Sequence, residues 1–556
     1  MAATTFDTRR AQMFPRLEAA EIDRLRRFGQ VIRAEAGAAL ATSGVPSPGL
    51  FVILAGRVAI SRRDAHNDSQ PIVEHAAGQF IGEIAQLSGR PSLVDVTAIS
   101  EVEALLIAPE RLRAVLVAEA ELGERIMRAL ILRRVSLIET GAGGPIIVGR
   151  AADSEVIRLS GFLARNGHPY QHLDPDEMDC AKVLIQRFEV DESELPIVLC
   201  PDGTLLRQPT NYQLGRCIGL VGPIDSDRIY DVAVVGAGPA GLATAVYAAS
   251  EGLSVLVLDT RAFGGQAGAS ARIENYLGFP TGISGMALMG RAYGQAQKFG
   301  AELAIPDEVA SLDCEEGSHR YRLKLASGES AQAKTVVIAS GARYRRLEVE
   351  NLDRFEGACV HYWASPLEAK LCAGQEVALV GAGNSAGQAA VYLASQVKKV
   401  WMIVRGESLA ATMSRYLIER IESTPNIEVV VKSQVVDLEG DAPDGKGGQL
   451  SAVRWRGPGG LETTQAISHL FLFIGAAPNT AWLAHCRVEL DNHGFVRTGT
   501  DLAPGHPLLQ TSRKGVFAIG DARAGSVKRV AAAVGEGAQA VAVHAAHRKV
   551  PYASAR

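Results

Sequence analysis

The pattern of apolar and polar residues changes near residue 231, where a short apolar run leads into closely spaced glycines. Residues 232–235 read as a buried strand. Gly236, Gly238 and Gly241 then follow in G-x-G-x-x-G register before a helix predicted over residues 242–249. Glycine permits the tight turn and lets backbone N–H groups approach an anion, while the helix N-terminus adds partial positive charge. The pattern therefore predicts a site for the pyrophosphate of a dinucleotide.

The residues after this helix support that prediction. A second apolar run over residues 253–258 ends in Asp259, about 20 residues beyond the glycines, where a ribose hydroxyl needs an acceptor. The alternative is a chance glycine turn in a glycine-rich chain. Strand, glycines, helix, second strand and terminal acid in this order favour the dinucleotide site.

A related pattern recurs later in the chain. A strand predicted over residues 376–380 precedes Gly381, Gly383 and Ala386 in G-x-G-x-x-A register, and its following strand ends in Arg405 rather than in an acid. A carboxylate there would accept from a 2′-hydroxyl, whereas a guanidinium suits a 2′-phosphate. The second site is therefore expected to prefer NADPH over NADH.

Short apolar runs broken by Gly and Pro occupy the first 140 residues. Helical periodicity is expected over residues 19–28 and 110–140. Strands are predicted over residues 49–54, 58–62, 71–74 and 94–99. Many short strands separated by turn residues indicate a small jelly-roll barrel.

Composition and charge narrow the class of protein. The 556 residues are 47% hydrophobic, enough for three or four domains with their own cores. The 57 Lys and Arg residues against 61 Asp and Glu residues give no indication of a nucleic-acid or membrane partner. The seven cysteines form no C-x-x-C pair, as expected of thiols in a reducing cytosol. With no apolar run long enough for a membrane span, a cytoplasmic protein is expected.

Four stretches from residue 229 onward resemble the low-molecular-weight thioredoxin reductases. They are FGGQAGASARIENYLGFP (263–280), TVVIASGA (335–342), FIGAAPNT (473–480) and GVFAIGDARAGSVKRVAAAVGEGAQA (515–540). The resemblance implies an oxidoreductase that uses FAD and NADPH. It implies that Gln266 and Asn275 reach the flavin, that Asp521 bonds its ribityl chain, and that the backbone N–H of Val530 meets its pyrimidine ring.

The two cofactor sites can be written out on this basis. The residues expected to bind FAD are Gly236, Gly238, Pro239, Ala240, Gly241, Asp259, Gln266, Asn275, Gly341, Gly520, Asp521, Arg529 and Val530. The residues expected to bind NADP are Gly381, Gly383, Asn384, Ser385, Ala386, Arg405 and Gly475. No metal site is predicted.

One feature of that family is missing. Thioredoxin reductases carry C-A-x-C just before the second dinucleotide strand, and the alignment places Trp363 and Pro366 on the two cysteine positions. Disulfide exchange needs an attacking thiolate and a resolving thiol, which neither residue supplies. Cys359 and Cys372 flank the position and are either a substitute redox pair or two structural thiols. No catalytic residue is therefore assigned.

The barrel contains a second resemblance. Residues 78–98, GQFIGEIAQLSGRPSLVDVTA, resemble the phosphate-binding cassette of cyclic-nucleotide-binding domains. The resemblance implies a pocket at Gly82, Glu83, Arg90 and Ser92, with Glu83 accepting from the ribose. The arginine that clamps the cyclic phosphate is replaced by Ser92, and Arg90 lies before the proline. The pocket is a working cyclic-nucleotide site, a sensor for another small ligand, or a docking module.

Residues 144–222 alternate strands and helices. The predicted strands cover residues 145–148, 195–199 and 205–206, and the predicted helices cover residues 155–165, 181–188 and 212–218. This order resembles a thioredoxin- or glutaredoxin-like fold, with Leu195–Pro196 at its cis-proline position. The expected C-x-x-C turn reads AADS, so a redox-silent spacer or docking domain is predicted. Cys180, Cys200 and Cys217 are interpreted as buried or incidental thiols.

The predicted fold class is α/β and multidomain: a jelly-roll barrel with helices, a thioredoxin-like α/β domain, and two Rossmann-like three-layer domains. The expected domains are a cyclic-nucleotide-binding-like domain (1–140), the thioredoxin-like domain (144–222), an FAD domain (229–349 and 474–548) and an NAD(P)H domain (350–473). The leading hypothesis is electron transfer from NADPH through FAD to a redox carrier protein of the ferredoxin, flavodoxin or thioredoxin type. The N-terminal domain is expected to regulate this output. The alternatives are thioredoxin-disulfide reduction by other thiols, a flavin-based redox sensor, and an enzyme that runs electrons backwards from ferredoxin. By resemblance alone, a homodimer is expected.

Overall fold

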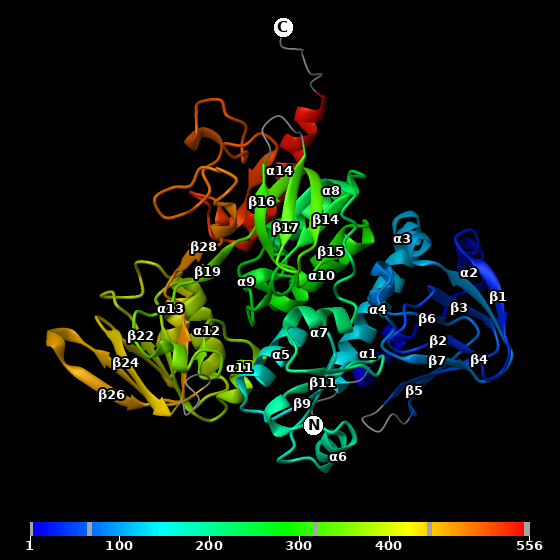
Figure 1. Ribbon diagram of the computed structural model, residues 1–556, viewed down its shortest axis with the longest axis horizontal. Coiled ribbons are helices and arrows are strands. Elements are labelled where there is room, and N and C mark those ends of the chain that lie inside the picture. The colour runs from blue at the N-terminus through cyan, green and yellow to red at the C-terminus, as the bar shows by residue number, and fades with distance from the viewer. Residues whose placement is uncertain (1–3, 64–68, 142, 315–319, 442–447, 550–556) are drawn as a thin grey trace, which may run out of the picture.

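The computed structural model describes residues 4–63, 69–141, 143–314, 320–441 and 448–549. Four parts follow one another along the chain, and we name them by residues: the barrel segment (1–140), the linking segment (144–222), the FAD segment (229–349 and 474–548) and the NAD segment (350–473). In Figure 1 the linking segment lies below the centre, between the blue barrel segment and the yellow NAD segment, and the green FAD segment lies above it.

Two four-stranded sheets form the barrel segment. Their orders are β1-β8-β3-β6 and β2-β7-β4-β5. The strands are β1 (Gln30–Ala34), β2 (Ala39–Ala41), β3 (Leu50–Ala55), β4 (Arg57–Arg63), β5 (Ser69–Ala76), β6 (Phe80–Ile81), β7 (Asp95–Ala98) and β8 (Val102–Ile107). Phe51, Ile53 and Val58 on their inner faces are buried. The four predicted strands are confirmed as β3, β4, β5 and β7, and the structure adds β1, β2, β6 and β8.

The helices of the barrel segment depart from the predicted pattern in two places. They are α1 (Thr5–Met13), α2 (Ala19–Arg26), α3 (Pro109–Ala118) and α4 (Ala120–Thr140). The single helix predicted over residues 110–140 is broken at Glu119, whose backbone leaves the helical region. The Glu119 carboxylate is buried and pairs with Arg24 and Arg27, which fixes the break. Helix α1 was not predicted; Thr4 and Asp7 start it with a capping box.

One mixed sheet, of order β10-β9-β11-β12, forms the linking segment. Its strands are β9 (Ile146–Val148), β10 (Gln171–Leu173), β11 (Ile197–Leu199) and β12 (Leu205–Arg207). Its helices are α5 (Ser154–Arg165), α6 (Asp179–Arg187) and α7 (Asn211–Cys217). Strand β9 pairs parallel with β10 and antiparallel with β11. The Leu195–Pro196 bond is cis, as predicted.

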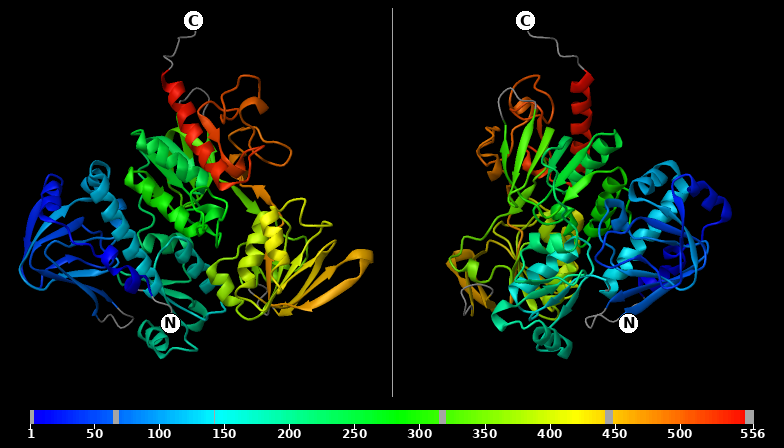
Figure 2. Two further views of the ribbon diagram at one scale, coloured as in Figure 1. Left: turned by 180° about the vertical axis from the view of Figure 1, so that it is seen from behind. Right: turned by 45° about the vertical axis from the view of Figure 1, so that its right-hand side comes forward.

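A seven-stranded sheet builds the FAD segment, in the order β15-β14-β13-β18-β17-β16, with β29 paired to β18. Its strands are β13 (Ile229–Val235), β14 (Val255–Leu258), β15 (Glu302–Ala304), β16 (Val309–Asp313), β17 (Tyr321–Leu325), β18 (Ser330–Ile338) and β29 (Val516–Ala518). Its helices are α8 (Pro239–Ser250), α9 (Gly265–Gly268), α10 (Gly285–Lys298) and α14 (Val530–Lys549). Helix α14 runs beside α8 on one face of the sheet, as Figure 2 shows.

The NAD segment repeats this arrangement. Its five-stranded parallel sheet has the order β20-β27-β21-β22-β23, and β24-β25-β26 form a separate antiparallel sheet. The strands are β20 (Val360–His361), β21 (Glu376–Val380), β22 (Lys399–Ile403), β23 (Ile427–Val430), β24 (Gln434–Asp441), β25 (Gln449–Arg456), β26 (Glu462–Ala466) and β27 (His469–Leu472). The helices are α11 (Pro366–Leu371), α12 (Asn384–Ala394) and α13 (Arg415–Glu422). The chain enters and leaves through the paired strands β19 (Ala342–Tyr344) and β28 (Ala476–Pro478).

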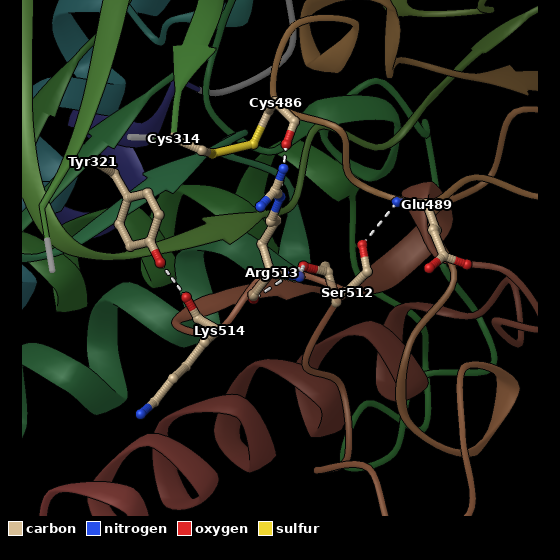
Figure 3. The surroundings of a disulfide bond; sticks show 8 residues. Cys314, Tyr321, Cys486, Glu489, Ser512, Arg513 and Lys514 are labelled. Carbon is tan, nitrogen blue, oxygen red and sulfur yellow. Dashed lines mark hydrogen bonds between the residues drawn. A yellow bond between two sulfur atoms is a disulfide. The ribbon is translucent and has the colours of Figure 1, made fainter. Parts of the chain in front are cut away.

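The cysteines correct the sequence analysis. Cys200 and Cys217, interpreted as incidental thiols, form a disulfide between the end of β11 and the end of α7. Cys314 and Cys486 form a second disulfide, beside which the Arg513 side chain donates to the Cys486 carbonyl (Figure 3). The paired cysteines are 17 and 172 residues apart in the sequence, so no short sequence motif indicates either disulfide. None of the described helices is both long and apolar enough to cross a membrane.

Candidate cofactor site

A cleft of about 1310 Å³ lies between the FAD and NAD segments. Almost all of the residues expected to bind FAD line it, together with two of those expected to bind NADP. From the FAD segment these are Gly236, Gly238, Pro239, Ala240, Asp259, Gln266, Asn275, Gly341, Gly520, Asp521, Arg529 and Val530; from the NAD segment they are Asn384 and Ser385. The fold thus brings together predicted residues that lie up to 294 positions apart (236 to 530).

The first glycine loop has the shape of an anion cradle. Gly236 has a φ of +113°, and a Cβ there would overlap the Ala339 carbonyl. A Cβ at Gly241 would overlap the carbonyl of Gly236, so this glycine permits close packing of α8 on the strand rather than lining the cleft. Gly238, by contrast, faces open space, with its nearest neighbour at 4.0 Å from the built Cβ. The loop therefore leaves room for a pyrophosphate at the N-terminus of α8.

Asp259 has a second task besides the predicted ribose contact. One of its carboxylate oxygens accepts from the backbone N–H of Ala237 at 2.8 Å, and the other accepts from the N–H of Arg261 at 2.9 Å. The acid at the end of β14 thus braces the glycine loop from the neighbouring strand.

The C-terminal residues of the FAD segment close the cleft. Burial raises the pKa of Asp521 above its ordinary range, while Lys528 opposes that effect. The backbone N–H of Gly520 donates to Glu536 at 2.6 Å, which ties the loop to α14. The Gln266 amide donates to the Ala342 carbonyl. A half-buried carboxyl and an anchored amide at the cleft wall fit the polyol and ring edges of a flavin.

The second glycine loop is built in the same way. Gly381 has a φ of +146° and lies against the Phe473 carbonyl, while nothing lies within 4 Å of a Cβ built at Gly383. Ala386, in the first turn of α12, is buried. Arg405 is exposed after β22, the parallel neighbour of β21, so it lies at the same sheet edge as the glycines. Gly475, with a φ of +95°, follows β27 at that edge.

The position of the missing dithiol is occupied by a capped helix start. Pro366 is the first residue of α11, and Ser365 forms a capping box with Glu368. The indole N–H of Trp363 donates to the buried Glu368 carboxylate at 2.8 Å. Trp363 lines the cleft where the disulfide would meet a flavin. These contacts hold the segment rigid but supply no thiol.

Several residues of the cleft carry no sequence signal, and Arg165 is the one that comes with a charge from the linking segment. Arg165, at the end of α5, donates to the Gly265 carbonyl at 3.1 Å, and its guanidinium lies 5.0 Å from the centre of the Trp363 ring. Partial burial lowers its pKa. Arg165 thus brings a half-buried cation from the linking segment to the cofactor cleft. Its partners are 100 and 198 positions away, beyond the reach of local pattern.

The remaining thiols near the cleft are poor nucleophiles. Cys359 and Cys372 are free and buried. Burial raises the pKa of the Cys359 thiol, and burial together with Glu368 raises that of Cys372 to about 12. The thiolate is the reactive form, so both are inert near neutral pH. Cys372 also approaches His361 and His469, whose ligand atoms all lie within 4.8 Å of one another, a group able to hold a metal ion that the sequence did not reveal.

The barrel pocket differs from its expected form. Gly82, Glu83 and Ser92 line it, but Glu83 forms an ion pair with Arg134 of α4. Arg90, expected in the pocket, does not line it; its guanidinium turns outward to the hydroxyl of Tyr293 on α10. The Arg90 guanidinium also lies over the Tyr293 ring, 5.5 Å from its centre. The cassette therefore contacts the FAD segment.

Comparison with known proteins identifies the class. Residues 230–537 match the family described as pyridine nucleotide-disulphide oxidoreductase, and residues 31–119 match the cyclic nucleotide-binding domain. The chain belongs to the pyridine nucleotide-disulphide oxidoreductase family. It is an NAD(P)H- and FAD-dependent oxidoreductase of thioredoxin reductase type, with an N-terminal domain of the cyclic-nucleotide-binding fold.

Individual relatives cover the second half of the chain. The thioredoxin reductase of Mycoplasmopsis pulmonis is 30% identical over 316 residues, which are 56% of this chain and 96% of that protein. The NADPH-dependent thioredoxin reductase 3 of Arabidopsis thaliana is 32% identical over 60% of this chain and only 63% of that protein's length. The crystal structure of T. acidophilum thioredoxin reductase aligns with a TM-score of 0.52 at 28% identity, covering 58% of this chain and all of that one.

Proposed function

We propose that this chain passes electrons from NADPH through FAD to a redox carrier protein, without an internal dithiol. The observation that carries the proposal is the occupation of the dithiol position by Trp363 and Pro366, with Cys359 and Cys372 buried as protonated thiols. FAD supplies hydride acceptance and one-electron release when bound. A carrier of ferredoxin or flavodoxin type needs no covalent bond to the protein, so it fits a site with no reactive sulfur.

The chain's own groups would perform three tasks. The glycine loops at Gly236–Gly241 and Gly381–Ala386 hold the two pyrophosphates, Asp521 and Gln266 orient the flavin, and Trp363 excludes water from its face. Arg405 selects the 2′-phosphate of NADPH. Hydride transfer between the two cofactors needs this positioning rather than an acid or base from the protein.

Anaerobic mixing of the flavin-loaded protein with NADPH and then NADH tests the first step of the proposal, the transfer of electrons from NADPH to FAD. We expect NADPH to bleach the flavin absorbance, and Arg405→Gln to weaken NADPH binding about tenfold while leaving NADH unchanged, as for loss of one charge-assisted contact. Arg456→Gln, an exposed arginine on β25, is the matched control. Equal use of both nucleotides by the unchanged protein would reject the predicted preference for NADPH. No bleaching by either nucleotide would reject the proposal that the chain reduces FAD with NADPH.

Reoxidation of the bleached protein distinguishes between the candidate electron acceptors. Ferredoxin and flavodoxin are expected to restore the flavin absorbance faster than thioredoxin does, and Cys359→Ser with Cys372→Ser should leave these rates unchanged. Rapid thioredoxin turnover that is lost in the cysteine variants would instead establish disulfide reduction by other thiols.

The second candidate is a flavin-based redox sensor with little turnover. It is favoured by the linking segment, whose Arg165 and Gly161 on α5 lie against Trp363 and Leu367 and so cover the dithiol side of the cleft. Slow reoxidation by every carrier, with a flavin-dependent change in the exposure of α5 to proteolysis, would support the sensor.

A further inference from the structure

The barrel segment encloses a pocket whose lining is mostly apolar. Its volume is about 80 Å³, and α1 closes one side of it. Apolar side chains come from α1 and from both sheets: Phe6, Phe14, Phe51, Ile60, Ile72 and Val96. A dry engineered cavity of about 150 Å³ holds a benzene molecule, so this pocket suits a molecule of single-ring size or less, admitted by a small shift of α1. A purine nucleotide is much larger.

The charged groups around the pocket are already satisfied from within the chain. The guanidinium of buried Arg133 donates to the carbonyls of Met13 at 3.0 Å, Gly82 at 2.9 Å and Phe80 at 3.0 Å. Glu83 is paired with Arg134. Ser92, at the position of the family's phosphate-clamping arginine, donates to the Val94 carbonyl at 2.7 Å. The lining therefore does not fit the charge of a cyclic phosphate.

Two polar atoms of the lining point to a different ligand. His75 Nδ1 and Gln86 Oε1 are buried and have no hydrogen-bond partner within the described chain. The Gln86 amide nitrogen donates to Ser47 Oγ at 2.9 Å and to the Gly49 carbonyl at 3.0 Å, which fixes the side chain and leaves its oxygen as an acceptor. Burial lowers the pKa of His75 to about 4, so its ring is neutral. An unpaired buried acceptor costs about 1–3 kcal/mol unless a ligand pairs it.

We propose that the barrel pocket binds a small, uncharged, largely apolar molecule that donates a hydrogen bond to Gln86, and not a cyclic nucleotide. The apolar lining buries the body of the ligand, and the Gln86 oxygen fixes its donor. Phe14, whose ring centre lies 5.2 Å from that of His75, is part of the α1 cover over the bound molecule.

The pocket lies next to a packed contact with the FAD segment. Beyond Gln86 in the cassette, Arg90 reaches Tyr293 on α10, and Tyr293 stacks on Phe263 with ring centres 4.4 Å apart. Phe263 directly precedes the glycines that border the cofactor cleft. A ligand that shifts the cassette would thus change contacts beside the flavin.

Titration calorimetry on the full-length flavin-loaded protein tests the proposal, with phenol and pyrrole as single-ring, donor-bearing probes, toluene as a probe without a donor, and cAMP and cGMP as nucleotides. Phenol or pyrrole is expected to bind, toluene at least fivefold more weakly, and the nucleotides not at all. Gln86→Leu should weaken the donor-bearing probe about tenfold and bring it level with toluene. Gln12→Leu, the same change at an exposed site on α1, should leave affinity unchanged.

The opposite results overturn the proposal. These are binding of cAMP or cGMP, failure of both phenol and pyrrole to bind up to their solubility limits, or equal probe affinity in the unchanged protein and in a folded Gln86→Leu variant. Because Gln86→Leu also removes two hydrogen bonds, its folding is checked by flavin content and thermal unfolding. Gln86→Met, which keeps the length of the side chain and removes the acceptor oxygen, provides the second variant and should also bring phenol and pyrrole level with toluene.

Discussion

At the scale of single residues, Arg165 joins parts of the chain that the sequence keeps separate. Its guanidinium lies between the Gly265 carbonyl and the Trp363 ring, and it interacts electrostatically with Asp259, Glu368 and Arg261. The three neighbours carry two negative charges and one positive charge. A partly desolvated cation needs such partners, and a bound dinucleotide would add more negative charge. We therefore expect Arg165, contributed by the linking segment, to act as a positioning residue for the FAD site.

Replacing Arg165 with Met keeps much of the side-chain length and removes the charge. We expect FAD to dissociate about tenfold more readily, because a charge-assisted contact of about 1.5–3 kcal/mol is weakened. The measurement is the free-flavin fluorescence released on dilution, together with Trp363 emission as a reporter of the stacked guanidinium. Arg158→Met on the same helix, outside the cleft, is the control. Unchanged FAD release and unchanged tryptophan emission would contradict this role.

Residues that act through local sequence were predictable, and residues that act through long-range contacts were not. The two glycine loops, Asp259 and Asp521 follow from spacing and resemblance, and the fold brings the first loop and both acids to one cleft. Arg165, the Glu83–Arg134 pair and both disulfides depend on partners 17 to 198 positions apart, and nothing in their surrounding sequence marks them. Arg90 shows the limit most directly, because its cassette was identified but the direction of its side chain was not.

At the scale of elements, the parallel pair β20 and β27 holds two neutral histidines in the NAD segment. His361 Nε2 and His469 Nδ1 lie 3.0 Å apart and their rings stack on each other, while the His361 ring also lies tilted against that of Phe471. Burial lowers the pKa of His361 to about 3 and that of His469 to about 4. In the unfolded chain both would titrate near 6.5. Burying this pair therefore costs no stability well above that pH, and the cost grows as the pH falls below it.

The consequence is a loss of stability in mild acid. Between pH 6.5 and pH 4 the unfolded chain takes up protons on these histidines that the folded chain refuses, so the free energy of unfolding falls as the pH falls. We expect His469→Gln to reduce this fall by roughly 1–2 kcal/mol between pH 7.5 and pH 5, measured by urea unfolding of the flavin-loaded protein. His493→Gln, at an exposed position, should leave the fall intact. An equal fall in wild-type protein and in His469→Gln would disprove the assignment.

At the scale of the whole molecule, the linking segment contacts each of the other three segments. Its Arg165 and Asn166 donate to the FAD segment, its Gly161 faces Leu367 of the NAD segment, and its Gly219 abuts Pro91 of the barrel cassette. The reductase relatives match the chain only from the FAD segment onward. The linking segment therefore lies over the side of the cleft that holds Trp363, the residue aligned with a dithiol position of thioredoxin reductases.

Removing residues 1–222 would uncover that side. The remaining chain corresponds to nearly the full length of relatives such as the Mycoplasmopsis pulmonis enzyme, which supports folding without the first two segments. We expect it to bind FAD less tightly, since Arg165 is lost, and its bleached flavin to be reoxidised several-fold faster by ferricyanide because Trp363 is no longer covered. Stopped-flow absorbance of both proteins, each saturated with FAD and reduced by NADPH, measures the two rates. Comparable rates would mean that the linking segment shields nothing, and electrons would then leave by another face of the cleft.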